Sequence, residues 1–217
     1  MANSTRLRIV FVSAEVAPFA KTGGLADVAG SLPKALQALG HDVHVIMPAY
    51  QSIETALREG RSDLTALPGQ LNVPTGPGPV PIGVLQSHLP GSDVPIYFIA
   101  EDHLFNRSQI YGYYDDAFRF AFFSRAAIEL TTALDWRPDI MHAHDWHTAP
   151  AITWLSTAGQ TDAHYRGIST IFTIHNLMHQ GHTSWDVFNY LKLLTFFNYF
   201  SKSLNLVSKT FWVISFD

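Results

Sequence analysis

Residues 13–28, SAEVAPFAKTGGLADV, decide the fold of this chain. They follow LRIVFV at residues 7–12, an apolar and β-branched run that is typical of a buried strand. They precede leucine and valine residues that recur at helical spacing from Leu25 to Leu39, and Gly40 stands where the end of a helix favours glycine. The sequence therefore predicts a strand, a glycine-containing turn and a helix in direct succession.

This succession is typical of a site for an anion. The first N–H groups of a helix have no partner within the helix, and the helix dipole adds partial positive charge there. Gly23 and Gly24 present no side chain to a ligand, and Lys21 adds a full charge. We expect a phosphate here, although similar turns occur in α/β proteins that bind nothing at this place. The pattern is neither GxGxxG nor GxxxxGK[ST], which disfavours ordinary dinucleotide and P-loop sites.

The composition is that of a folded globular chain, with 217 residues, 47% hydrophobic and 15% charged. The net charge of −4 gives no electrostatic basis for binding nucleic acid. The absence of cysteine excludes disulfides, thiolate metal sites and cysteine nucleophiles. No run approaches the roughly 18 apolar residues of a membrane span, and residues 1–12 do not form a signal peptide. We therefore expect a cytoplasmic protein without a membrane partner, and leave a plastid location open.

Further along the chain, predicted strands alternate with predicted helices. The expected strands are residues 42–48, 94–100, 140–142 and 169–174, and the expected helices are residues 51–60, 116–132 and 149–158. Proline and glycine in residues 67–91 predict an irregular hairpin on one edge of the sheet, and residues 101–114 a loop. Asp115 or Asp116 is expected to cap the helix that follows. The alternation predicts an α/β fold, a Rossmann-like parallel sheet with helices on both faces.

Two polar clusters follow strands of this predicted sheet, HAHDWH at residues 142–147 and HNLMHQG at residues 175–181. Ligands of open α/β sheets bind at this edge. His142 and His144 would point the same way on a strand, as two metal ligands do, or else contact substrate or pack in the core. No second motif completes a metal set, so we expect no metal, and a metal-dependent hydrolase is the least favoured function. Glu15 has three open roles: catalytic carboxylate, organiser of the loop, or ion-pair partner.

Taken together, three motifs resemble the family of bacterial glycogen synthases and plant starch synthases. They are KTGGLADV at residues 21–28, HAHDWH at residues 142–147, and FTIHNL at residues 172–177 followed by Gln180 and Gly181. GHDV at residues 40–43 and MPAY at residues 47–50 fit as well, so the resemblance covers roughly residues 6–182. His179 departs from the pattern, since the family usually has tyrosine there.

The resemblance implies the N-terminal half of a GT-B fold. It also implies a retaining glucosyltransferase that moves glucose from ADP-glucose to an α-1,4-glucan, with no cofactor besides this substrate. By the same resemblance, Lys21, Gly23 and Gly24 bind the donor, and Asp145 and His175 act at the glucose site. Further candidates for the sugar site are Glu15, His144, Asn176 and Gln180.

The resemblance further implies a second domain that these residues do not contain. We expect residues 1–182 to form the N-terminal catalytic domain. Residues 183–217 form an apolar, aromatic tail, divergent or truncated and helical in part, which packs back on the sheet or meets that second domain. The expected partners are ADP-glucose, an α-1,4-glucan, and the C-terminal GT-B domain or a full-length synthase. We expect the chain to be inactive alone; the alternative is a non-catalytic glucan-binding or regulatory fragment.

Overall fold

The computed structural model describes residues 5–59, 63–181 and 185–190. The strands are β1 Arg8–Val12, β2 Asp42–Pro48, β3 Thr65–Ala66, β4 Leu71–Pro74, β5 Pro79–His88, β6 Pro95–Ala100, β7 Ile140–His144 and β8 Ser169–Thr173. The helices are α1 Gly24–Ala38, α2 Gln51–Arg58, α3 Asp102–Phe105, α4 Asp116–Ala133, α5 Ala149–Ser156 and α6 Trp185–Tyr190, with a 3₁₀ turn at Ala158–Thr161.

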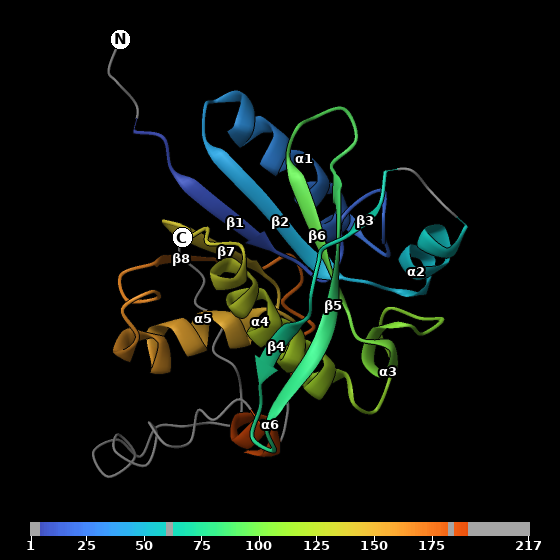
Figure 1. Cartoon of the computed structure of the whole chain (residues 1–217), viewed down its shortest axis with the longest axis vertical. Helices are drawn as coiled ribbons and strands as arrows, with labels where there is room; N and C mark the ends of the chain where they lie inside the picture. The colour runs from blue at the N-terminus through green and yellow to red at the C-terminus, as the bar shows by residue number, and fades with distance from the viewer. Residues whose placement is uncertain (1–4, 60–62, 182–184, 191–217) are drawn as a thin grey trace.

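In this described part of the chain the strands form a mixed, mostly parallel sheet in the order β3-β5-β6-β2-β1-β7-β8, with β4 paired to β5 (Figure 1). The pairs β6–β2, β2–β1, β1–β7 and β7–β8 are parallel. Strand β5 is antiparallel to β3, β4 and β6. The parallel core and the hairpin at one edge, β4 with β5, are confirmed.

The centre of the sheet is covered on both faces. Val10, Phe11 and Val12 of β1 are all completely buried, and successive residues of a strand point to opposite faces. Figure 1 shows α1 behind the strands and α4 in front of them. Helix α4 packs against α5 and β4, and α5 packs against β7 and β8. The prediction of helices on both faces is therefore confirmed.

The turn between β1 and α1 is held by close packing. A Cβ atom at Gly30 would lie 2.6 Å from the carbonyl oxygen of Ala17, so the loop before α1 lies directly on the helix. The N–H of Ala17 also donates to the carbonyl of Ala26 at 3.0 Å. Gly40, with φ 94°, follows the helix in the left-handed conformation that glycine adopts without strain. The strand, turn and helix predicted from residues 7–40 are confirmed.

The prediction of a plain loop over residues 101–114 is wrong, because this segment contains the short helix α3. The carboxylate of Glu101 caps α3 by accepting from the N–H of Leu104 at 2.7 Å. Strand β7 also runs two residues further than expected, so that His144 lies within the strand rather than after it. The first difference comes from a local capping bond and the second from pairing of the end of β7 with β8, and the apolar pattern reveals neither.

The prediction that Asp115 or Asp116 caps α4 holds for the position but not for the side chain. Asp115 occupies the N-cap position, but its side chain makes no capping hydrogen bond. Both of its oxygens accept instead from the guanidinium of Arg107, at 2.7 Å each. Asp116 accepts from the N–H of Gly112, which precedes the helix, at 2.7 Å. Both carboxylates therefore hold the preceding loop, and within the described residues neither caps the free N–H groups of α4.

Helix α6 lies against α4. The ring of Tyr190 is 5.3 Å from that of Phe118, and the carbonyl of Tyr190 accepts from the N–H of Gly76 at 2.9 Å. This is the described part of the predicted tail. Residues 182–184 and 191–217 lie outside the described residues, so the boundary at residue 182 and the behaviour of the tail stay predictions.

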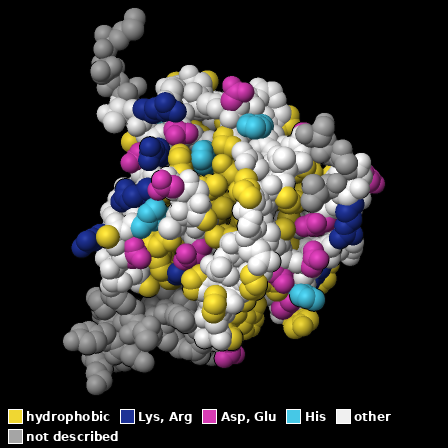
Figure 2. All heavy atoms as spheres, in the orientation of Figure 1, with side chains coloured by type: hydrophobic (Ala, Val, Ile, Leu, Met, Phe, Trp, Pro, Cys, Tyr) yellow, Lys and Arg dark blue, Asp and Glu magenta, His cyan; other side chains and the backbone are white. Residues whose placement is uncertain are grey.

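Charged side chains are interspersed on the face shown in Figure 2, where Lys and Arg lie beside Asp and Glu. This distribution agrees with the small net charge of −4. Across the described ranges, no helix combines the length and the apolar character that crossing a membrane requires.

Candidate active site

The candidate site is a cleft of about 800 Å³ at the carboxyl ends of the parallel strands. Four segments line it: the turn before α1, the loop between α3 and α4, the loop after β7 and the loop after β8. The structure thus brings the predicted glycine turn and the two predicted polar clusters into one cavity. Its position agrees with the rule that ligands of open α/β sheets bind at this edge.

The carboxylate of Glu15 organises the glycine turn. Glu15 is only 3% exposed, and it accepts hydrogen bonds from the N–H groups of Thr22 and Gly23. It also accepts from the hydroxyl groups of Thr22 and Tyr111, both at 2.7 Å. Burial raises the pKa of Tyr111, which keeps its hydroxyl a donor. Of the three roles open for Glu15, organising the loop is the one that these contacts support.

Lys21 does not line the cleft. Its ammonium group contacts the carboxylate of Asp27 at 2.6 Å, and the two side chains are 51% and 58% exposed. An exposed pair of this kind contributes about 0–1 kcal/mol to stability, so breaking it costs Lys21 little. Gly23 and Gly24 do line the cleft, and a Cβ atom at either position would meet no atom within 4 Å. The space in front of the two glycines is therefore open to a ligand.

Asp145 joins the ends of β7 and β8. Its backbone has φ 57°, the left-handed conformation that aspartate tolerates better than most residues. Its carboxylate accepts from the N–H groups of His175 at 2.7 Å and Asn176 at 3.4 Å, while its own N–H donates to the carbonyl of Thr173 at 2.9 Å. Asp145 therefore fixes the path of the loop after β8, which carries His175 and Asn176 into the cleft.

Histidine rings are stacked beneath the cleft. The rings of His142 and His144 lie 4.2 Å apart, as expected for two residues on one face of a strand, and His175 continues the stack 5.2 Å from His144. Nε2 of His142 contacts the hydroxyl of Thr173 at 2.7 Å, and Nδ1 of His144 contacts Nε2 of His175 at 2.9 Å. These ring nitrogens are thus used within the protein.

Burial keeps several of these histidines neutral. It lowers the pKa of His142 to about 4 and that of His147 to about 3, and it holds the pKa of His144 well below its usual value. At neutral pH these rings therefore act as hydrogen-bonding groups and aromatic surfaces rather than as cations.

Within the described ranges, no three side chains of His, Cys, Asp or Glu are grouped as a metal site requires. His142 and His144 do point the same way, but their nitrogens contact Thr173 and His175. The hydrolase alternative therefore has no supporting geometry in this part of the chain.

Most of the site residues predicted from the sequence line the cleft: Glu15, Gly23, Gly24, Asp145, His175 and Asn176. The exceptions are Lys21, His144 and Gln180. His144 is completely buried beneath the cleft. The amide of exposed Gln180 donates to the carbonyl of Leu177 at 3.1 Å.

Sequence reasoning missed Tyr111 and Asp116, which also line the cleft. The ring of Tyr111 stacks on that of His147 at 4.6 Å, across 36 positions of the chain. Both residues lie in or next to a polar segment that was expected to be a loop. Nothing in the local pattern separates Tyr111 from solvent-exposed loop residues, and Asp116 is predicted only as a helix cap, so no signal in the single sequence places either in a site.

Comparison with known proteins agrees with this geometry. The starch synthase catalytic domain family matches residues 8–210. Glycogen synthase 1 of Geobacter sulfurreducens is 42% identical over 205 residues, which cover 87% of this chain and 40% of the relative. Glycogen synthase of Moorella thermoacetica is 45% identical over 177 residues, which cover 81% of this chain and 34% of the relative.

The structure is also similar to the catalytic domain of starch synthase IV from Arabidopsis thaliana, solved with bound ADP and acarbose. The TM-score is 0.71 at 34% identity, covering 86% of this chain and 37% of that one. The chain thus spans two fifths or less of the length of these relatives. On the sequence match and the shared fold together, this chain belongs to the starch synthase catalytic domain family, which the glycogen synthases share.

Proposed function

We propose that this chain is the part of a retaining α-glucan synthase that holds the transferred glucose and one side of the donor diphosphate. The observation that carries the proposal is the single cleft that contains the start of α1, with Gly23 and Gly24, together with Asp145 and His175. An anion site and a polar sugar site in one cavity suit a sugar nucleotide. The Arabidopsis relative, solved with ADP and acarbose, supports ADP-glucose as donor and an α-1,4-glucan as acceptor.

The diphosphate would lie at the start of α1. Glu15 already accepts from the N–H groups of Thr22 and Gly23, so the ligand is left with the next groups, those of Gly24 and Leu25, which also line the cleft. These groups and the helix dipole stabilise negative charge on the leaving diphosphate. Lys21 would add a full positive charge once its ammonium group leaves the carboxylate of Asp27 and contacts the diphosphate.

The glucose would lie over the loop that Asp145 holds. Positive charge develops on the sugar as the diphosphate departs, and a cation beneath it would oppose that charge. His142 and His144 do not do so, because burial holds the pKa of His144 well below its usual value and lowers that of His142 to about 4. We propose that the other side of the site comes from the C-terminal domain of a GT-B fold.

We expect Lys21→Ala to bind ADP about tenfold to a hundredfold more weakly than the parent, with unchanged stability. A charged contact with a phosphate contributes about 1.5–3 kcal/mol to the binding free energy. The small free energy of the Lys21–Asp27 ion pair, which must break first, is subtracted from it. Lys21 is half exposed at 51%, so its removal leaves no cavity. Calorimetric titration of ADP measures the effect, and thermal unfolding checks the fold.

Asp27→Asn is the matched control, because it removes the competing carboxylate and keeps Lys21. This variant is expected to bind ADP at least as tightly as the parent. Equal affinity for ADP in the parent and in Lys21→Ala would remove Lys21 from the donor site. A parent chain that does not bind ADP at millimolar concentration would contradict the proposed function itself.

A further inference from the structure

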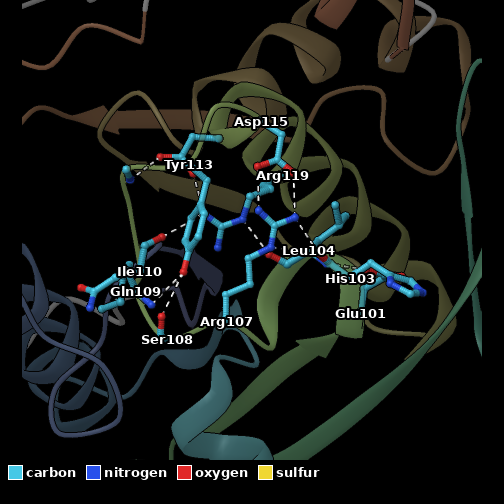
Figure 3. A network of polar contacts seen from close by, with 12 residues as sticks. Glu101, His103, Leu104, Arg107, Ser108, Gln109, Ile110, Tyr113, Asp115 and Arg119 are labelled. Carbon is cyan, nitrogen blue, oxygen red and sulfur yellow. Dashed lines mark hydrogen bonds and ion pairs between the residues drawn. The ribbon is translucent and has the colours of Figure 1, made fainter.

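Arg119, in the first turn of α4, is completely buried, and its guanidinium joins both ends of the loop between α3 and α4 (Figure 3). Nε donates to the carbonyl of Leu104 at 2.6 Å, and Nη1 donates to the carbonyl of Ile110 at 3.0 Å. Nη1 also contacts the carboxylate of Asp116 at 2.6 Å. One side chain therefore fixes the end of α3, the middle of the loop and the start of α4.

A second arginine holds the same loop from within. Arg107 forms a two-pronged ion pair with Asp115, at 2.7 Å for each nitrogen–oxygen contact, and donates to the carbonyl of His103 at 2.6 Å. The guanidinium carbons of Arg107 and Arg119 lie 4.8 and 4.9 Å from the centre of the Tyr113 ring. Figure 3 shows the three side chains together inside the loop.

Stability alone does not account for Arg119. A buried ion pair contributes little net stability, because removing both charges from water costs about as much as their attraction returns. Nη2 of Arg119 has no hydrogen-bond partner within the described residues, which adds to that cost. An apolar side chain of similar volume would avoid both costs, but would leave the carbonyls of Leu104 and Ile110 without this donor. The guanidinium is therefore best explained by the groups that it holds in place.

Those groups lead into the cleft. Tyr111, Gly112 and Asp116 line it, and the carboxylate of Asp116, held by Arg119, accepts from the N–H of Gly112. Tyr111 follows Ile110, whose carbonyl Arg119 fixes, and its hydroxyl donates to Glu15.

We propose that Arg119 is a positioning residue for the candidate active site. Its guanidinium fixes the loop over residues 104–116, and this loop sets Tyr111 against Glu15, which in turn holds the glycine turn. Arg119 does not line the cleft itself. The expected effect of Arg119 on ligand binding rests on the proposed function. Its effect on the position of the loop does not.

The test is amide hydrogen exchange, followed by NMR on the full 217-residue chain, in the parent and in Arg119→Lys. Lysine keeps the positive charge, but a single ammonium group lacks the planar fork that reaches Leu104, Ile110 and Asp116 together. Exchange at the N–H groups of Gly112 and Gly23, which bond to Asp116 and Glu15, is expected to become at least tenfold faster. Exchange in β1 and β2 is expected to stay the same.

Arg125→Lys is the matched control. Arg125 lies on the same helix, pairs with Glu129 and packs over the ring of Trp154 at 3.9 Å, but does not line the cleft. The Arg125→Lys substitution is expected to lower the melting temperature without changing amide exchange at Gly112 or Gly23. Asp116→Asn is a second, nearly isosteric variant, which decides the question if Arg119→Lys does not fold. Its amide cannot accept from both Arg119 and Gly112, so exchange at Gly23, which Asp116 does not contact, is expected to rise if the loop positions Tyr111 against Glu15.

In Arg119→Lys, exchange at Gly112 and Gly23 could rise no more than exchange in β1. That result would show a merely structural role for Arg119 and overturn the proposal. Titration with ADP distinguishes a failure of this proposal from a failure of the proposed function. We expect Arg119→Lys to bind ADP more weakly than the parent; equal affinity in the two chains would also overturn the proposal. A parent that binds no ADP would contradict the proposed function, and the exchange experiment would still decide the role of Arg119.

Discussion

The 217-residue chain, purified alone, is expected to transfer glucose from ADP-glucose to glycogen at least a thousandfold more slowly than an intact glycogen synthase. It spans 40% of the Geobacter relative, and under the proposed function its cleft would offer the donor only the start of α1 and the loop after β8. Such an open site leaves water around the reacting groups, where each electrostatic contact is weaker. Correct positioning accounts for about 7–11 kcal/mol of barrier lowering, and loss of half of this alone slows turnover about 400-fold to 10,000-fold.

The assay is transfer of labelled glucose to glycogen, with an intact glycogen synthase measured under the same conditions. Turnover within tenfold of the intact enzyme would show that this chain holds the whole site and would contradict the prediction. Binding of maltoheptaose without transfer agrees with it, and is also what a glucan-binding fragment would show.

The second large effect is a loss of stability in mild acid. Burial lowers the pKa of His44 and His142 from 6.5 to about 4, and that of His147 to about 3. Below pH 6.5 the unfolded chain therefore binds protons that the folded chain does not, which favours unfolding. As the pH falls below 6.5, each such histidine lowers the free energy of unfolding by up to about 1.4 kcal/mol per pH unit, until the pH reaches its pKa in the folded chain. Since domains of this kind are stable by about 5–15 kcal/mol, the chain is expected to unfold before pH 4.

Urea unfolding at pH 7, 6 and 5 measures this effect, and the midpoint should fall at each step. His142→Asn is the matched variant, because asparagine does not titrate but can still bond to the hydroxyl of Thr173, the partner of His142. Its stability should fall less steeply with pH than that of the parent. A urea midpoint that stays constant from pH 7 to pH 5 would show that these histidines are not buried in the neutral form.

The elements closest to the site could be predicted from the sequence, because their signals are local. The apolar run at residues 7–12 and the helical spacing after Gly24 each fix one element. The clusters after β7 and β8 meet because parallel neighbours in a sheet end at the same edge. Asp145 and His175 therefore lie together although 30 positions separate them.

The loop between α3 and α4 could not be predicted in this way. Tyr111 reaches Glu15 across 96 positions, and the pattern around it carries no helical or strand period. Arg119 is one of four charged residues in the mostly apolar helix α4, and nothing in the local sequence separates it from the others. The partner of Lys21 was also missed, since Asp27 was considered only as part of a motif.

We propose that one cleft binds both parts of the sugar nucleotide. Titration of ADP-glucose into the isotope-labelled chain, followed by amide NMR shifts, is the decisive experiment, with Asp145→Asn as the variant that weakens the loop after β8. Shifts are expected at Gly24 and Leu25 together with His175, and with ADP alone only at the start of α1. Shifts confined to the separate hollow of about 570 Å³ beside α2, or no shifts at millimolar ADP-glucose, would contradict it.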